Sequence, residues 1–371
     1  MTPTAVPTRP EDVPAALASG AIRRDRTAEP EPADLAALAV LTGSVDVDTP
    51  AGRAGSARQV RALARVDASA AQLVAAHHAA RALAGPELAG GGHPATWYTH
   101  TAVPRHPAVR GTWRADGLLL SGTAPVPPGR GRDRLVVEAV TPADGRPVVA
   151  VVDAAAVRSG AAAFGQRWAA PATADLDGVL VPVDRTRPGA ADRTWRAYDE
   201  TLHAALDLGV LDGFLTAARD FLLHHARPWH ESGTDTASRD PHAIAVFGHA
   251  YAQRQALDRL VAAAIHALDP AAGTPPTAAW PTADSTARPD TAAEPGPPRA
   301  AVLARWYAHH RIGQVVSAVI GVLGASGTAG RFALDRYWRD FRTHALRQPP
   351  YWTLADLDRP GDAGPAEGVD R

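Results

Sequence analysis

The C-terminal half of the chain repeats apolar residues at helical spacing. Leu202, Leu206 and Val210 recur every four residues, an interval that keeps their side chains on one face of a helix. Similar stripes follow, so that four in all run over residues 202–221, 244–268, 306–323 and 332–346. Four amphipathic helices in succession predict a four-helix bundle. Residues 270–298, rich in Pro, Ala and Thr, separate the second stripe from the third and predict a long loop.

In the middle of the chain the apolar pattern changes to short runs with turn residues between them. Residues 109–113 and 118–122 flank Asp116-Gly117, and residues 135–140 and 148–152 flank Asp144-Gly145. Each pair of runs predicts a hairpin. Residues 176–182 predict one further strand. We expect a small sheet in antiparallel meander order. No alternation of strands with helices and no glycine-rich phosphate motif accompanies it, which excludes a Rossmann fold and a P-loop.

Helical spacing is also present towards the N-terminus. Residues 56–83 predict a helical stretch, which the glycines at 90–92 and Pro94 bring to an end. The residues before this stretch are rich in Ala, Pro, Arg and Asp and predict only short helices. The whole chain is therefore expected to be mainly helical with a β middle domain. Its expected parts are an N-terminal helical region at 1–94, a β-rich domain at 95–190, the bundle at 191–357 and a flexible tail at 358–371.

Composition narrows the classes of function. The chain has 38 basic and 39 acidic residues, and its net charge of −1 offers no basic surface to nucleic acid or anionic lipid. No run of about 18 apolar residues is available to span a membrane. The first residues also lack the apolar core of a secretory signal. We therefore expect a cytoplasmic protein that binds neither nucleic acid nor membrane.

Two residue types that often carry chemistry are missing. The chain contains no cysteine, which excludes disulfides and thiolate catalysis. It contains no lysine, so any anionic group must be bound by arginine. Doubled histidines occur at 77–78, 224–225 and 309–310 and raise the question of a metal site. Adjacent residues on a helix point about 100° apart and no HExxH spacing is present, so the sequence predicts no metal site.

Four further motifs stand out along the chain. They are VRALARVDAS at residues 60–69, ARPWHESG at 226–233, GASG at 324–327 and LDRYWRDFRTH at 334–344. With the order of helices, β domain and bundle, they resemble the acyl-CoA dehydrogenase superfamily, and in particular its branch of dibenzothiophene-monooxygenase-like flavin-dependent monooxygenases. The match is specific over the bundle and weaker near the N-terminal helix, and almost none is found before Ser56.

The resemblance implies a cofactor and a reaction. Members of this branch bind reduced FMN or FAD from a separate flavin reductase, and with dioxygen they oxygenate a small organic substrate, while the protein supplies a dry pocket and proton control. His77 and His344 stand where the family keeps its two active-site histidines, whose pKa near neutrality suits proton transfer. The resemblance also implies a homo-oligomer, a dimer or tetramer, and a role in specialised metabolism.

Four more residues are expected at the flavin. Arg227 matches an arginine that binds the flavin phosphate, and Ser326 and Gly327 match a glycine turn beside the flavin. Trp168 stands in a turn that the family places next to the cofactor. Each candidate side chain also has a structural alternative. These alternatives are a core position for His77, a helix-end cation for His344, a surface charge for Arg227 and a tight turn for Ser326.

The β domain departs from the family pattern where flavin donors are expected. Residues 122–129 place a proline at the position of a flavin-binding serine, and residues 167–171 carry no hydroxyl. Proline has no N–H to donate. A second hypothesis is therefore a degenerate homologue that keeps the fold and the oligomer without flavin redox chemistry, as a partner or a non-redox catalyst. A third is an acyl-CoA dehydrogenase, which needs a carboxylate base that residues 346–350 lack.

Overall fold

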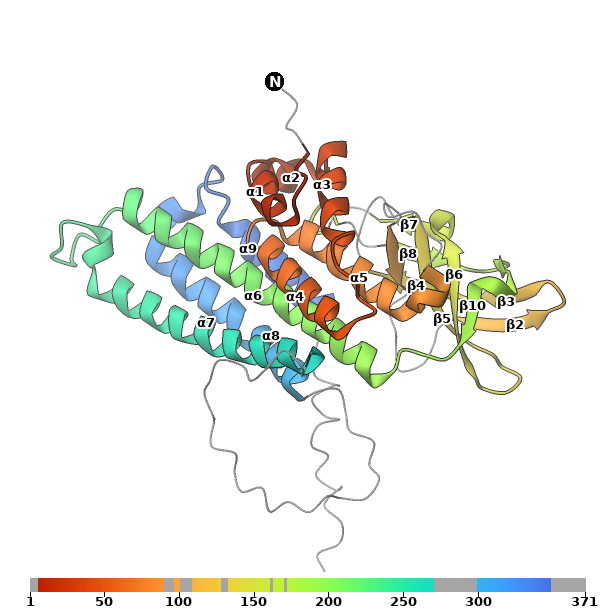
Figure 1. The fold of residues 1–371 in the computed structure, drawn as a ribbon. Coiled ribbons are helices and arrows are strands. Elements are labelled where there is room, and N and C mark those ends of the chain that lie inside the picture. Colours follow the sequence, from red (N-terminus) through yellow and green to blue (C-terminus); the bar gives the residue numbers. More distant parts are fainter. Residues whose placement is uncertain are drawn as a thin grey trace, which may run out of the picture.

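The computed structural model arranges the chain as N-terminal helices, a β domain and a C-terminal helical bundle. It describes residues 6–89, 97–100, 109–127, 133–160, 163–169, 172–269 and 299–347. Figure 1 shows the strands at one end of the bundle and the first helices seated on its flank. The fold class expected from the sequence is confirmed. The loop at 270–298 and the tail at 358–371 lie outside the described residues.

Short helices precede the first long ones, as the composition predicted. The N-terminal helices are α1 (Val13–Ala18), α2 (Ala21–Thr27), α3 (Pro32–Thr42), α4 (Pro50–Ala64) and α5 (Ala68–Ala89). The single helical stretch expected at 56–83 is thus two helices. Asp67 causes the break, because its carboxylate accepts the N–H of Ala70 and so caps the start of α5. Near its C-terminal end α5 kinks at Gly85, whose φ of 71° is not helical.

The β domain contains both expected hairpins but not a simple meander. Its strands are β1 (Tyr98–His100), β2 (Arg110–Arg114), β3 (Gly117–Ser121), β4 (Thr123–Val126), β5 (Arg134–Val140), β6 (Pro147–Asp153), β7 (Val157–Ser159), β8 (Ala172–Asp175), β9 (Leu180–Val181) and β10 (Thr186–Pro188). One sheet has the order β10-β6-β5-β2-β3-β9, and a second has the order β4-β8-β7. Both β1 and β2 pair with β5 in parallel, so the expectation of an all-antiparallel meander was wrong.

The strand expected at residues 176–182 is largely a turn. Only Leu180–Val181 is extended, as β9. The preceding Gly178 has a φ of 78°, a left-handed conformation that reverses the chain after β8. The apolar run therefore contributes Leu176 and Val181 to the core between the strands and does not form one continuous strand.

Four long helices form the bundle, as the stripes predicted. They are α6 (Arg193–His224), α7 (Pro241–Leu268), α8 (Arg299–Leu323) and α9 (Asp335–Arg347). A further helix, α4, also packs along α6. Gly209 and Gly213 permit this close packing. A Cβ at Gly209 would lie 2.4 Å from the backbone oxygen of Arg61, and a Cβ at Gly213 would lie 2.1 Å from that of Arg65. The second stripe is only partly buried, since Ile244 and Tyr251 on α7 face solvent.

Two apolar cores meet at β5 and β6. The larger core joins the N-terminal helices to the bundle, and the smaller one fills the space between the β sheets. Neighbouring residues of β5 serve different cores: Val136 faces the helices, whereas Leu135 and Val137 face the β core. Strand alternation thereby attaches the β domain to α5. Among the helices described here, none has the length and apolar character needed to cross a bilayer.

Candidate active site

A line of polar side chains interrupts the apolar surface of α6. Asp199, His203 and Asp207 are spaced four residues apart, so they lie on one face of the helix. All three are buried. Charged groups are rarely buried unless they are paired, so this face needs partners from neighbouring helices.

His344 on α9 supplies the first partner. Its Nδ1 lies 2.6 Å from Oδ1 of Asp207, and its Nε2 lies 2.9 Å from Nδ1 of His203. The other nitrogen of His203, Nε2, faces Oδ1 of Asp199 at 3.5 Å. The four side chains therefore form a continuous row of carboxylate, imidazole, imidazole and carboxylate. His344 is one of the two histidines predicted from the sequence, whereas His203 was not predicted.

Arg305 on α8 completes the cluster from the other side. It is fully buried, donates through Nη1 to Asp207, and donates through Nε to Glu200 at 3.2 Å. Burial alone would raise the pKa of Asp207, but the charges and hydrogen bonds of His344 and Arg305 outweigh it and lower that pKa. Burial raises the pKa of Glu200 to about 7, against the opposing effect of Arg305. Asp207 is therefore ionised, and Glu200 titrates near neutrality.

Both ring nitrogens of His344 are thus engaged inside the protein. A ligand can reach a ring nitrogen of His344 only if one of these two bonds opens. The bond to His203 is the weaker one, because the bond to ionised Asp207 is shorter and charge-assisted. Asp207 fixes the orientation of the ring in the same way that a carboxylate orients a catalytic imidazole. This arrangement can hold a proton at a defined position in a buried site.

The second predicted histidine, His77, lies on α5 beside β1. Its Nδ1 accepts the N–H of Tyr98 at 3.2 Å, and its ring packs edge-on against Trp97, Tyr98 and His78. Burial lowers the pKa of His77 well below its usual value, and His78 and Arg81 lower it further. His77 is therefore a neutral imidazole, and because Nδ1 accepts a bond its proton resides on Nε2.

The two histidines belong to adjoining parts of the structure. Helix α5, which carries His77, contacts both α6 and α9. Trp195 at the start of α6 donates its indole N–H to the backbone oxygen of Ala79, 2.7 Å away, which fixes α5 against α6. The ring neighbours of His77 are nevertheless different from those of His344, whose aromatic contact is His203. The two histidine clusters thus lie on helices that pack against one another.

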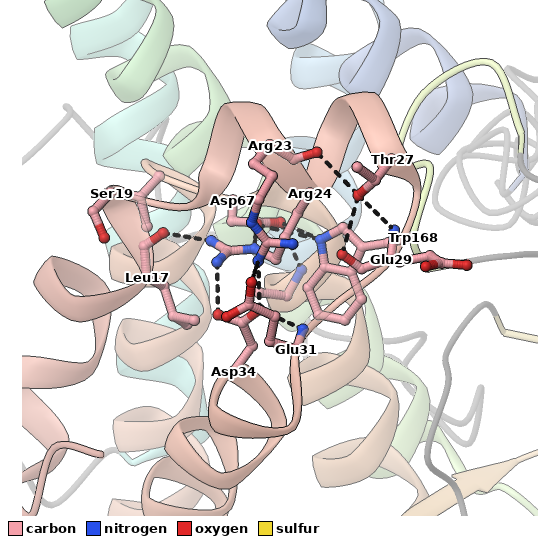
Figure 2. Close-up of polar contacts among 12 residues, drawn as sticks. Leu17, Ser19, Arg23, Arg24, Thr27, Glu29, Glu31, Asp34, Asp67 and Trp168 are labelled. Carbon is pink, nitrogen blue, oxygen red and sulfur yellow. Dashed lines mark hydrogen bonds and ion pairs between the residues drawn. The ribbon is translucent and has the colours of Figure 1, made fainter. Parts of the chain in front are cut away.

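Trp168 has a structural role in this chain. It is 1% exposed, and its indole N–H donates to Asp67 at 3.1 Å. Asp67 also accepts from Nε of Arg24 at 2.8 Å, and Arg24 reaches Asp34 and the backbone oxygen of Leu17 (Figure 2). Trp168 therefore anchors its turn to the N-terminal helices. The sequence-based expectation that its indole lies at a cofactor stays a prediction.

The turn that carries Trp168 is also attached to α9. The N–H of Gly165 donates to Thr343 at 2.8 Å, and the N–H of Gln166 donates to Asp340 at 2.5 Å. Burial raises the pKa of Asp340 to about 7, only partly opposed by the Gln166 amide and by Arg336. The amides of Gly165 and Gln166 are thus already used within the protein, so they are not available to a flavin.

The remaining predicted cofactor residues lie at the far end of the bundle. Arg227 is exposed in the segment between α6 and α7, and Ser326 is exposed in the turn after α8. Gly327 is buried against α8 and Phe221, so the turn and the end of α6 are neighbours. From Asp207 to the end of α6 the helix rises about 25 Å, and Figure 1 shows this end opposite the β domain. One chain does not bring Arg227 to its own His344.

Among the buried polar atoms without a hydrogen-bond partner in the described residues, three lie on α5 and β1, the elements that carry His77 and its partner Tyr98. They are Oε1 of Gln72 and Nε2 of His78 on α5, and Oγ1 of Thr99 on β1. Buried polar groups are normally satisfied, so these atoms are available to a partner that the described residues do not supply. Pro125 of β4 has no N–H to offer a ligand. Within the described ranges no group of three or more His, Asp or Glu side chains is arranged to hold a metal ion.

A separate hollow lies on the flank of the bundle. It encloses about 670 Å³ between α1, α4, α6 and α9, and its charged lining residues are Glu11, Arg65, Asp220 and Arg336. None of the predicted site residues lines it. It is distinct from the histidine clusters.

The chain resembles known proteins in sequence and in fold. No protein-family model matches the chain. A dibenzothiophene monooxygenase from Rhodococcus erythropolis is 29% identical over 264 residues, which cover 66% of this chain and 60% of that enzyme. A probable FMNH2-dependent monooxygenase, SfnC, from Pseudomonas putida is 29% identical over 181 residues, which cover 48% of this chain and 42% of that protein. The matched part of the chain thus spans about three-fifths of the length of the first of these relatives.

Solved structures agree over nearly the whole chain. The complex of TdsC from Paenibacillus sp. A11-2 with FMN and indole superposes with a TM-score of 0.77 at 21% identity, covering 94% of each chain. Butyryl-CoA dehydrogenase from Megasphaera elsdenii superposes with a TM-score of 0.72 at 14% identity, again over 94% of each chain. The chain has the acyl-CoA dehydrogenase fold. Within that fold the two distant sequence relatives named above are a dibenzothiophene monooxygenase and a probable FMNH2-dependent monooxygenase.

The sequence did contain a signal for the residues that were missed. Asp199, His203 and Asp207 interrupt the first apolar stripe at a regular interval of four residues. Such a spacing on an otherwise apolar helix indicates a buried polar row when another helix can supply the countercharge. The countercharge, Arg305, lies about a hundred residues further along the chain, so the sequence alone did not pair them.

Proposed function

We propose that this protein is an FMN-dependent monooxygenase that acts on a small organic substrate in specialised metabolism. The observation that carries the proposal is the His344–Asp207 pair, a buried imidazole oriented by an ionised carboxylate on the helix whose sequence most resembles the monooxygenase branch. The distant relatives that act as monooxygenases support it, and one of them is described as FMNH2-dependent. Reduced FMN, supplied by a separate reductase, would provide the electrons that activate dioxygen.

The chain's own residues would orient the reaction and control protons. His77 is neutral and carries its proton on Nε2, so it donates a hydrogen bond to an oxygen without bringing a charge into the pocket. His344 is buried between Asp207 and His203, so it holds a proton away from bulk solvent. Proton transfer by positioned groups of this kind contributes about 10²–10⁴-fold to rates.

Binding of the flavin phosphate would need a second copy of the chain. Arg227 is exposed and makes no hydrogen bond or ion pair with the described parts of its own chain, so its guanidinium is available to a phosphate. It lies about 25 Å along α6 from the histidine row, too far for one FMN molecule to bridge within a single chain. We therefore propose a homo-oligomer, a dimer or tetramer, in which Arg227 and Ser326 of one subunit serve the flavin of its neighbour.

Anaerobic titration with FMN and FAD, in reduced and oxidised form, tests the proposal. Reduced FMN is expected to bind with saturation, and Arg227→Ala is expected to weaken binding at least about tenfold by removing a charge-assisted contact with phosphate. Arg219→Ala is the matched control, since Arg219 is another exposed arginine near the same end of α6. Equal effects of the two substitutions would show that Arg227 does not bind the phosphate.

A degenerate homologue without flavin chemistry is the second candidate, because two expected donors are absent. The prolines within residues 122–129 have no N–H, and residues 167–171 carry no hydroxyl. The amides of Gly165 and Gln166, just before that second stretch, are bonded to α9. Each missing hydrogen bond lowers cofactor affinity by about 0.5–1.5 kcal/mol. Failure of every flavin form to bind would favour this candidate, in which the chain acts as an oligomeric partner or a non-redox catalyst.

A further inference from the structure

The row formed by Asp199, His203, His344 and Asp207 contains more hydrogen-bonding positions than two neutral imidazoles can fill. The contact of His344 with Asp207 needs a proton on Nδ1 of His344, because an ionised carboxylate only accepts. The nitrogen-to-nitrogen contact between His344 and His203 needs one proton between the rings. The nitrogen of His203 that faces Asp199 needs a third proton, since without one its lone pair would face a carboxylate oxygen.

The three contacts thus require three protons on four ring nitrogens. Two neutral imidazoles carry only two protons, so one additional proton is present in the pair. We propose that Asp199 and His203 hold this additional proton next to His344, so that the two rings share a single positive charge between two carboxylates. His203 and Asp199 are then positioning residues, which act on the reaction through His344.

The surrounding charges favour this arrangement. On α6 the groups that face the rings are Asp199, Asp207 and Glu200, and on α8 they are Arg305 and His309. The shared imidazolium and Arg305 offset the negative charges of Asp199 and Asp207, while burial raises the pKa of Glu200 to about 7 and so holds it near neutral. A buried cluster of this kind is stable only when its charges are balanced.

Titratable groups on the other nearby helices do not change the net charge of this cluster. Burial, His310 and Arg305 lower the pKa of His309, so that ring stays neutral. On α5, which also contacts α9, burial lowers the pKa of His77 and brings that of His78 to about 3. Arg342, on α9 itself, is exposed and its charge is screened by solvent. No further cation among these groups competes for the space between Asp199 and Asp207.

The shared proton has a chemical use that rests on the proposed function. When the bond between the rings opens, as ligand contact requires, the shared proton leaves on Nε2 of His344 and passes to an oxygen in the site. Two neutral rings then remain, each with one N–H. Asp199 remains at the end of the row to accept the N–H of His203 when that ring is protonated again. The side chain of Asp199 is about 10% exposed, so solvent reaches the row at this end.

Histidine ¹⁵N NMR of the flavin-free chain at neutral pH counts the protons directly. His344→Gln and His203→Gln assign the two rings. We expect three of the four nitrogens in the pair to be protonated, as the three contacts require. Two protonated nitrogens would overturn the proposal, because both rings would then be neutral. Since this measurement needs no flavin, its outcome is independent of whether the chain proves to be a monooxygenase.

Variants at Asp199 test whether its carboxylate keeps the additional proton on the two rings. Asp199→Asn removes the carboxylate and is expected to lower the number of protonated ring nitrogens in the pair from three to two. Asp199→Glu keeps a carboxylate and is expected to leave three protonated. Asp220→Asn is the matched control, because Asp220 faces His224 at the same spacing of four residues on α6 but in solvent. With reduced FMN and a turned-over substrate, Asp199→Asn should lower kcat about 10–100-fold at unchanged flavin affinity. An unchanged proton count in Asp199→Asn would contradict the role given to this carboxylate.

Discussion

Substitution of Arg305 by methionine is the perturbation that tests the buried cluster most severely. Methionine keeps the apolar stem of the side chain and removes its charge. Arg305 is fully buried and contacts Asp207, which is fully buried as well, and Glu200. Breaking a buried ion pair from one side costs about 3–5 kcal/mol, because the other charge is left without compensation. His344 stays at 2.6 Å from Asp207 and keeps part of the compensation, so we expect a loss of about 3 kcal/mol.

Arg61→Met is the matched control for this substitution. Arg61 on α4 also contacts two carboxylates, Asp212 and Asp258, but its side chain is 27% exposed. When Arg61 is removed, Arg254 still contacts Asp212 at 2.7 Å and Asp258 at 3.3 Å. Both carboxylates therefore remain compensated, and the expected loss is about 0–1 kcal/mol.

Urea unfolding followed by circular dichroism measures both losses. The midpoints are compared at equal slope, since a changed slope would indicate a different extent of unfolding. Arg305→Met is expected to lose at least about 2 kcal/mol more stability than Arg61→Met. Equal losses, or a smaller loss for Arg305→Met, would refute the reasoning that burial makes this ion pair costly to break.

Three further predictions concern other parts of the account. Burial raises the pKa of Asp340 to about 7, above the value of about 3.9 in an unfolded chain, so between these values the unfolded chain releases a proton that the folded chain keeps. The stability of the wild type therefore falls as pH rises through this window, whereas Asp340→Asn lacks this loss. The difference between the urea midpoints of Asp340→Asn and the wild type should grow from about pH 4 to pH 7 and then stay constant. A difference that does not change with pH would contradict this. Gly209→Ala should destabilise by about 1–3 kcal/mol, because its Cβ would lie 2.4 Å from the backbone oxygen of Arg61, whereas Gly248→Ala on open α7 should stabilise by about 0.5–1 kcal/mol. In stopped-flow assays with reduced FMN, His77→Gln should lower substrate oxygenation at least about tenfold more than it lowers flavin affinity, and equal losses would make His77 a structural residue.

The helices of this protein were predictable because their apolar residues repeat at helical spacing. Leu202, Leu206 and Val210 are all fully buried on α6, as the stripe required. Strand pairing was less predictable, since alternation places residues on the two faces of a strand but does not choose the neighbouring strand. Tyr98 on β1 therefore pairs with Arg134 in parallel, a contact that the two hairpins did not indicate.

The candidate site was only half visible in the sequence, for a similar reason. The resemblance indicated His344 and His77, but their partners come from other elements of the chain. Asp207 lies 137 residues before His344, and Asp67 lies 101 residues before Trp168. Contacts at such separations depend on how the helices pack, which the spacing of residues along one helix does not determine.

The central claim is that the chain uses reduced FMN to place one oxygen atom of dioxygen in a small substrate. The direct test is a single turnover of the protein, loaded with reduced FMN, with ¹⁸O-labelled dioxygen and a panel of substrates taken from the relatives, including indole and dibenzothiophene. The account predicts a product that contains one labelled oxygen atom for at least one substrate. Release of all the labelled oxygen as hydrogen peroxide or water with every substrate, or no loading with reduced FMN at all, would contradict it.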